Sequence, residues 1–280
     1  MNIQEFIIAA LAEDIGSGDH STLASIDAKV AGSAKLIVKE AGIIAGIRIA
    51  KEVFLHLDKE AVFTAYHTDG EYLEVGTIAF TVKAKAQAIL QAERLVLNTM
   101  QRMSGIATLT HSYVEKIKNY STTILDTRKT TPLFRAFEKE AVLLGGAKNH
   151  RMGLYDMIML KDNHIDYCGG IEKAIAAANN YLKEQQLQLP IEVETRSLDD
   201  VKRVVKVGGV QRIMLDNFTP QEIEAALVLI NKQFETEASG GINFDTIESY
   251  AATGVDFISV GAVIHHATSL DLSLKAVLHE

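Results

Sequence analysis

Pro190-Ile-Glu-Val-Glu-Thr195 begins a strand–helix–strand segment that decides the fold of this 280-residue chain. Its apolar residues alternate with Glu192 and Glu194, a spacing of two that places both carboxylates on one face of a β-strand. Leu198–Val207 follows with helical spacing, and Arg212-Ile-Met-Leu-Asp216 has the composition of a second buried strand. The segment therefore predicts one βα unit of a parallel sheet.

The same alternation extends from residue 120 to near the end of the chain. Strands are expected to begin near Thr123, Asp156, Pro190, Arg212, Glu235 and Val255, a spacing of roughly 20 to 35 residues that suits βα units. The helices expected between them are Leu133–Leu144, Gly170–Glu184, Leu198–Val207, Gln221–Asn231 and Phe244–Thr253. Six such repeats predict a parallel α/β barrel or part of one, with functional residues at the carboxyl ends of the strands.

The first part of the chain is predicted to be mixed α/β. Helices are expected over residues 3–12, over Ile47–Leu57 and from Ala86 to beyond Ala107, and strands at Ala34–Lys39, Ala61–Tyr66 and Thr77–Val82. We therefore expect an N-terminal domain over residues 1–108 and a catalytic barrel domain over residues 109–268. The tail, residues 269–280, is expected to be helical and could pack with the N-terminal domain.

The composition is ordinary for a globular enzyme: 48% of residues are hydrophobic, 23% are charged, and the net charge is −8. This charge disfavours nucleic acid or an anionic membrane as a partner. The single cysteine, Cys168, excludes an intrachain disulfide and a multi-cysteine metal site. The sequence has neither a signal peptide nor an apolar run of about 20 residues, so we expect a cytoplasmic protein.

One segment, from Asp126 to His164, has a positive net charge although the whole chain is acidic. Between Asp126 and His164, seven Lys or Arg residues outnumber five Asp or Glu residues. A cation that follows a buried strand is costly unless an anion meets it. Arg128 and Arg151 suit bidentate binding of carboxylates, whereas Lys129 and Lys161 would act as point charges. The segment therefore predicts a site for a small polyanionic substrate.

Acidic residues and glycines follow the later strands. Glu194 and Asp216 could hold Mg²⁺ directly or through water, contact sugar hydroxyls, or only pair with the nearby cations. Ser239-Gly240-Gly241 and Ser259-Val-Gly261 permit a close approach of the backbone to phosphate, although either glycine motif could instead serve a tight turn. Because the strand ends of a barrel converge, we expect all these residues to share one site.

These motifs resemble the quinolinate phosphoribosyltransferase family over essentially the whole chain. The most specific elements are Leu125-Asp-Thr-Arg-Lys-Thr-Thr-Pro132, His150-Arg151 and Leu160-Lys-Asp-Asn-His164. The resemblance implies an N-terminal α/β sandwich-like domain and an incomplete α/β barrel of about six strands. It also implies that quinolinate and phosphoribosyl pyrophosphate react with Mg²⁺ and no organic cofactor. The products would be nicotinate mononucleotide, pyrophosphate and CO₂, in de novo NAD biosynthesis.

The resemblance implies a role for each residue of the site. The quinolinate carboxylates would be held by Arg128, His150, Arg151 and Lys161, and by Arg102 from the other subunit of a homodimer with shared active sites. Phosphoribosyl pyrophosphate and its metal would be held by Lys129, Glu194, Asp216, Ser239, Gly240, Gly241 and Gly261, and Thr127 and Ser259 complete the expected substrate-binding set. The expected catalytic residues are Lys129, Lys161, Glu194 and Asp216. Leu133 and Ala147 depart from the pattern, because glycine is expected at both.

Three other functions are compatible with the same residues. Lys161 at a strand end could be the nucleophile of a Schiff-base aldolase or decarboxylase. A related phosphoribosyltransferase would use a different acceptor. A regulator that binds a phosphorylated metabolite would keep the cations, but it would not need the acids on the metal side.

Overall fold

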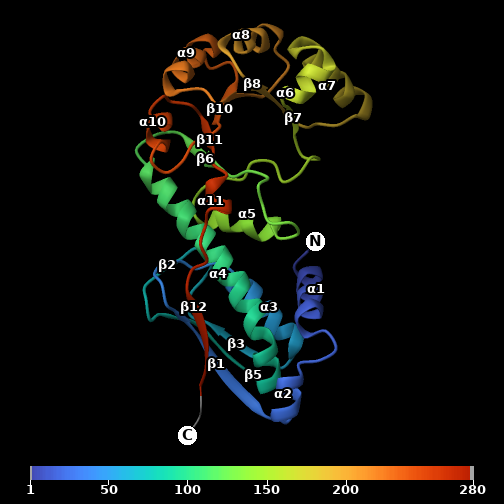
Figure 1. Ribbon diagram of the computed structural model, residues 1–280, viewed down its shortest axis with the longest axis vertical. Coiled ribbons are helices and arrows are strands. Elements are labelled where there is room, and N and C mark those ends of the chain that lie inside the picture. Colours follow the sequence, from blue (N-terminus) through green and yellow to red (C-terminus); the bar gives the residue numbers. More distant parts are fainter. Residues whose placement is uncertain (1, 278–280) are drawn as a thin grey trace. The chain divides into compact units, whose positions relative to one another are not determined.

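Figure 1 shows the computed structural model, which describes residues 2–277. The chain forms two units. Unit 1 contains Met1–His111, Thr131–Gly146 and His266–Glu280, and unit 2 contains Ser112–Thr130 and Ala147–His265. The segment Thr131–Gly146 therefore belongs to unit 1, although the βα repeats on either side of it belong to unit 2.

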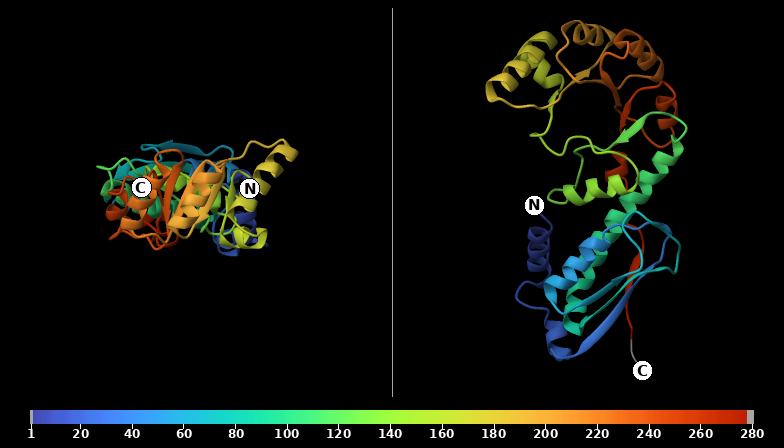
Figure 2. Two further views of the ribbon diagram at one scale, coloured as in Figure 1. Left: turned by 90° about the horizontal axis from the view of Figure 1, so that it is seen from above. Right: turned by 180° about the vertical axis from the view of Figure 1, so that it is seen from behind.

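Unit 2 is built on a six-stranded parallel sheet in the order β6-β11-β10-β9-β8-β7. The strands are β6 (Thr123–Leu125), β7 (Ile158–Leu160), β8 (Ile191–Thr195), β9 (Arg212–Asp216), β10 (Glu235–Ser239) and β11 (Phe257–Ser259). Among the described residues β6 and β7 are the two edges, so the barrel is open. The expected incomplete barrel of about six strands is confirmed, and Figure 2 shows its curved sheet with helices along the outer side.

Two of the helices of unit 2, α8 (Leu198–Val207) and α9 (Pro220–Ile230), begin at residues whose side chains cap them. Unit 2 also contains α6 (Asp162–Cys168), α7 (Ile171–Gln185), α10 (Ile247–Ala251) and α11 (Ala262–His265). The side chain of Ser197 accepts a hydrogen bond from Asp200 N–H at the start of α8, and Thr219 accepts one from Glu222 N–H at the start of α9. The helix α8 has the residues that its apolar spacing predicts.

Unit 1 contains a four-stranded antiparallel sheet in the order β12-β1-β5-β3. Its strands are β1 (Ala31–Val38), β3 (Val62–Ala65), β5 (Ile78–Lys85) and β12 (Leu272–Ala276), and β2 (Gly42–Ile43) pairs separately with β4 (Tyr72–Leu73). Its helices are α1 (Ile3–Ile15), α2 (His20–Ser25), α3 (Ile47–Leu57) and α5 (Arg135–Leu144), together with most of α4 (Ala86–Lys116). The helix α3 packs on β3 and β5 through the buried Phe54 and Phe80. No helix within residues 2–277 is long and apolar enough to cross a membrane.

The prediction of a helical tail over residues 269–280 is wrong for the part that the structure describes. Leu272–Ala276 is β12, and Leu274 lies opposite Leu36 of β1 in an antiparallel register. The buried Leu272 and Leu274 alternate with Ser273 and Lys275, which is the period of a strand rather than a helix. Residues 278–280 of the predicted helix lie outside the described residues.

Candidate active site

Four predicted site residues meet along the carboxyl edge of the parallel sheet. Lys161 follows β7, and its Nζ lies 3.1 Å from Oε2 of Glu194 in β8. Asp216 and Ser239 are paired in register at the ends of β9 and β10. Positive and negative side chains therefore lie side by side at the carboxyl ends of the strands, where parallel barrels have their active sites.

The electrostatics of Glu194 and Asp216 fit a divalent cation. Burial raises the pKa of Asp216, and the negative charge of Glu194 raises it further, although Lys161 and two hydrogen-bond partners act in the opposite direction. The positive charge of Lys161 therefore does not fully offset the two acids. Because carboxylate oxygens are preferred ligands of Mg²⁺, this pair can hold the ion directly or through water.

The two glycines after β10 have backbone conformations that favour glycine, and Gly261 after β11 lies close to Lys129. Gly240 has φ +98°, and a Cβ there would lie 2.8 Å from the backbone N of Asn217 and closer still to its side-chain oxygen. Gly241 has φ +64° and faces open space, which leaves its backbone accessible. A Cβ on Gly261 would lie 3.2 Å from Cδ of Lys129, so the lysine side chain lies beside the glycine of the last strand.

Two arginines lie close enough to influence each other electrostatically. Burial lowers the pKa of Arg151, and the charge of Arg128 lowers it further. The Nη1 of Arg151 donates to the carbonyl of Met157 at 3.3 Å. In the turn after β6, Lys129 N–H donates to Oγ1 of Thr127 at 3.1 Å. Two guanidinium groups that repel each other form a region that an anion with two carboxylates would stabilise.

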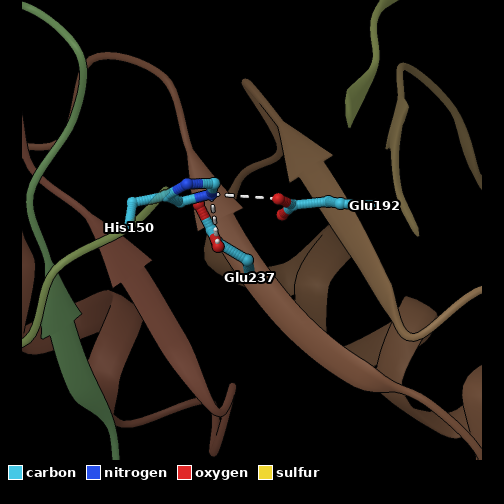
Figure 3. Close-up of side chains that lie close together, drawn as sticks. All are labelled: His150, Glu192 and Glu237. Atoms are coloured by element: carbon cyan, nitrogen blue, oxygen red, sulfur yellow. Dashed lines mark ion pairs between the residues drawn. The ribbon is translucent and has the colours of Figure 1, made fainter. Parts of the chain in front are cut away.

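His150 lies in a buried cluster with Glu192 and Glu237, which Figure 3 shows. Its Nε2 is 2.9 Å from Oε2 of Glu192 and 3.4 Å from Oε2 of Glu237. Arg212 Nη1 is 2.8 Å from the same Glu237 oxygen, and the Ser259 hydroxyl donates to the other oxygen of Glu237. The side chains of two predicted substrate-binding residues, His150 and Ser259, therefore contact carboxylates inside the sheet.

The protonation of this cluster follows from its contacts. Burial opposes a charge on the ring, but Glu192 and Glu237 outweigh it and raise the pKa of His150 to about 9. The backbone N–H of Arg151, however, donates to Nδ1 at 2.7 Å, and this bond requires a Nδ1 without a proton. A pKa of about 9 would place protons on both ring nitrogens, but a proton on Nδ1 would oppose the Arg151 amide. We therefore assign the neutral ring with its single proton on Nε2, facing the carboxylates. Burial, then the charge of Glu237, raises the pKa of Glu192 to about 7.

The buried cluster also has the donor types of a metal site, since one donor atom each from His150, Glu192 and Glu237 lies within 4.8 Å of the others. The Arg212 guanidinium already contacts Oε2 of Glu237, and the ring proton of His150 faces Glu192. A metal ion would have to displace the guanidinium and the ring proton. The cluster is therefore better described as a buried polar network built on the Arg212–Glu237 ion pair and the neutral His150 ring, and Glu194 with Asp216 is the better candidate for Mg²⁺.

Arg102 belongs to unit 1, whereas the other predicted cations belong to unit 2. Its Nε and Nη2 donate to Oε1 of Glu138 at 3.0 and 2.9 Å, and its Nη1 donates to the carbonyl of Ala267 at 2.8 Å. Glu138 is fully buried and also accepts hydrogen bonds from N–H and Oγ1 of Thr131. Arg102 is therefore held in one orientation by a residue of α5 that the sequence analysis did not identify.

Other residues of the site were also missed from the sequence. Glu237 carries a visible signal, because it is a carboxylate inside the short strand that ends at Ser239. Asp126 belongs to the most specific motif, and its carboxylate accepts the His150 N–H at 2.8 Å. Glu138 has no such signal, since it lies in a helix among other charged residues. A cavity of about 1160 Å³ lies at the opposite, amino edge of the sheet, near Pro190 and Gln211, and none of the predicted site residues lines it.

Comparison with known families assigns both parts of the chain. Residues 19–104 match the quinolinate phosphoribosyl transferase N-terminal domain, and residues 106–275 match the C-terminal domain of the same family. A nicotinate-nucleotide pyrophosphorylase (carboxylating, chloroplastic) of Oryza sativa is 43% identical over 98% of this chain and 77% of its own length. A probable nicotinate-nucleotide pyrophosphorylase (carboxylating) of Synechocystis is 41% identical over 95% of this chain and 90% of its own length.

Solved structures give the same result. NadC from Streptococcus pyogenes is 40% identical, with a TM-score of 0.92 over 98% of this chain and 95% of the other. A nicotinate-nucleotide pyrophosphorylase from Pyrococcus furiosus is only 15% identical, with a TM-score of 0.71 over 96% of this chain and 72% of the other, and it supports the fold alone.

Proposed function

This chain belongs to the quinolinate phosphoribosyltransferase family, and from that premise we propose that its site joins quinolinate to phosphoribosyl pyrophosphate with loss of CO₂. The products are nicotinate mononucleotide, pyrophosphate and CO₂, as in NAD biosynthesis. The supporting observation is the carboxyl edge of the open parallel sheet, where Lys161 pairs with Glu194 beside Asp216. Cations for the acceptor and acids for the donor therefore lie at one edge.

The acceptor carries two carboxylates, and the cations of the site match them. Arg128 and Arg151 are near each other and can each bind a carboxylate through two parallel N–H groups. Lys161, beside Glu194, would supply a further positive charge. These contacts would fix the pyridine nitrogen in place before the reaction, which is where positioning contributes to the rate.

Phosphoribosyl pyrophosphate, the donor, would bind near Gly241 and Gly261. Lys129 lies beside Gly261, where its charge can meet pyrophosphate oxygens, and Gly241 leaves backbone accessible to them. Glu194 and Asp216 would orient the ribose and hold Mg²⁺, directly or through water. The ion would neutralise charge on the leaving pyrophosphate.

The reaction then needs little covalent chemistry from the protein. The pyridine nitrogen forms a bond to C1 of the ribose as the C1–oxygen bond to pyrophosphate breaks, and the positive charge that develops on the ribose is stabilised by the nearby acids. The pyridine ring becomes a cation. The bond to the adjacent carboxylate then breaks, its electrons are drawn to the ring, CO₂ leaves, and the ring carbon takes up a proton.

An assay with quinolinate, phosphoribosyl pyrophosphate and Mg²⁺ tests this function, with nicotinate as a competing acceptor. We expect Arg128→Ala and Lys161→Ala each to reduce turnover roughly a hundredfold or more, because each removes a charge that orients the acceptor. Lys183→Ala, at an exposed position of α7, is the matched control and should keep normal turnover. Near-normal turnover in both site variants, or a preference for nicotinate, would contradict the proposal.

We further propose a homodimer in which Arg102 of one subunit completes the site of the other. The proposal is supported by the family resemblance, and Arg102 belongs to unit 1 whereas the remaining cations belong to unit 2. A cytoplasmic location remains a prediction from the sequence, which fractionation of cells that express the protein would test.

A further inference from the structure

The buried cluster of His150, Glu192 and Glu237 has no role in the reaction as derived above. The side chains of Glu192 and Glu237 are completely buried, and that of His150 is only 5% exposed. The two carboxylates come from β8 and β10, and the ring comes from the segment that follows β6 and α5 (Figure 3). Two ionisable groups from a sheet interior thus converge on one imidazole.

Stability is a weak explanation for this arrangement. Neither oxygen of Glu192 accepts a well-directed hydrogen bond, although Oε2 lies 2.9 Å from His150 Nε2. A buried carboxylate with poor hydrogen bonding costs free energy, and buried ion pairs are often no more stabilising than apolar residues of the same size. A network of this kind is better explained by what it orients.

The group that it orients is the backbone of Arg151. The Arg151 N–H donates to Nδ1 of the same imidazole at 2.7 Å, and the His150 N–H donates to Asp126 at 2.8 Å. Asp126 immediately precedes Thr127 and Arg128. Nε2 of the ring therefore faces the buried carboxylates, and Nδ1 accepts a hydrogen bond from the backbone N–H of Arg151, a predicted acceptor-binding residue.

We propose that Glu192 and Glu237 are positioning residues, which hold the His150 ring and through it set the backbone from which Arg151 reaches the carboxylates of the acceptor. This inference rests on the proposed function. The two glutamates contact neither substrate in this role. Their effect on the reaction passes through His150.

Substitutions that keep the shape of each side chain test the proposal. We expect Glu192→Gln and Glu237→Gln to raise the KM for quinolinate roughly tenfold to a hundredfold, since misplacement of a binding group by about 1 Å has effects of this size. The KM for phosphoribosyl pyrophosphate should change less than about twofold. The matched control is Glu235→Gln, which lies on the same strand and pairs with Arg212 without contacting His150. It should leave both constants near the wild-type values.

A double-mutant cycle separates positioning from general damage to the fold. If the glutamates act through the ring, Glu192→Gln should have little further effect on quinolinate binding in a His150→Gln background. Quinolinate affinity measured by isothermal titration calorimetry gives the same comparison without turnover. Equal increases in both KM values, or an undiminished effect of Glu192→Gln in the His150→Gln background, would overturn the proposal.

The inference can fail separately from the proposed function. A wild-type protein that forms no product from quinolinate and phosphoribosyl pyrophosphate would remove the function. If the wild-type protein is active but Glu192→Gln and Glu237→Gln bind quinolinate normally, only the positioning role is disproved. Thermal unfolding of each variant shows whether it is folded, and the two glutamates provide independent variants if one of them is not.

Discussion

At the scale of the residue, Arg102, which we propose binds the acceptor, is oriented by neighbouring side chains. Glu138 holds the guanidinium through two hydrogen bonds and is itself held by Thr131. We predict that Glu138→Gln raises the KM for quinolinate about tenfold, because it removes a charge-assisted bond worth roughly 1.5–3 kcal/mol. Steady-state kinetics with each substrate varied would measure the change.

Glu140→Gln is the control for this prediction, because Glu140 lies on the same helix and pairs with Arg48 instead. It should leave the KM for quinolinate unchanged. If the two variants had the same KM, orientation of Arg102 by Glu138 would not matter for acceptor binding.

Gly240 has a left-handed backbone conformation and lies close to Asn217. The contributions of these two features to stability can be measured separately. Gly240→Ala would add a methyl group against Asn217 at a position with φ +98°, whereas Gly254→Ala would add one at φ +83° with no atom within 4 Å. We predict a loss in free energy of unfolding of about 1 kcal/mol for Gly254→Ala and a clearly larger one for Gly240→Ala. Urea denaturation would measure both, and equal losses would show that the contact with Asn217 relaxes.

The residues that depart from the family pattern differ in their backbone conformation. Leu133, where glycine was expected, has φ +64° and a 79% exposed side chain, so the backbone there has the left-handed conformation that glycine favours. Ala147 is not among the residues with positive φ and is buried. The glycine of the family pattern therefore suits the left-handed backbone at the first position, whereas the second position has no conformational need for glycine.

At the scale of the element, the spacing of apolar residues predicted the helices and strands whose positions depend on nearby residues. The helix α8 and the six strands of unit 2 were found from apolar spacing. Lys161, Glu194 and Asp216 were predicted as site residues because each lies near the end of a strand or directly after it. Glu138 and Glu237 were not found. Glu237 is visible as a carboxylate inside a strand, but its role depends on His150, and that of Glu138 depends on Arg102. Both partners are distant in the sequence, so the local pattern does not indicate the pairing.

The tail was misread because its strand is short and pairs with a distant partner, β1. We predict that Leu274→Ala lowers the free energy of unfolding by about 2–4 kcal/mol, since the leucine is buried opposite Leu36. Lys275→Ala, at the exposed neighbouring position, should change it by no more than about 0.5 kcal/mol. Chemical denaturation of both variants measures the difference. Similar values would argue against the alternation of buried and exposed residues in β12.

At the scale of the whole molecule, the sequence predicted the number of parallel strands but not their closure. The strands β6 and β7 are consecutive in the chain yet form the two opposite edges of the sheet. Between them the chain leaves unit 2 for the helix α5 of unit 1 and then returns. Strand order of this kind depends on long-range packing, so the periodicity of the residues did not predict it. The family resemblance implied only that the barrel is incomplete.

The proposed sharing of active sites between subunits makes a prediction of its own. Arg102→Ala and Lys161→Ala should each be inactive alone, because each lacks one cation in every site. In a mixed dimer, one site would lack both cations and the other would be intact. Random reassembly of an equal mixture should therefore restore about a quarter of the wild-type activity, as expected for a two-fold symmetric dimer.

The control for this mixture is Arg128→Ala with Lys161→Ala. Both residues belong to unit 2, so each site of a mixed dimer would still lack one cation and no activity should return. Different affinity tags on the two variants allow mixed dimers to be purified before the assay. No activity in either mixture when mixed dimers are present would mean that Arg102 acts within its own subunit or not at all. Activity in both mixtures would contradict the assignment of Arg128 and Lys161 to one subunit's site.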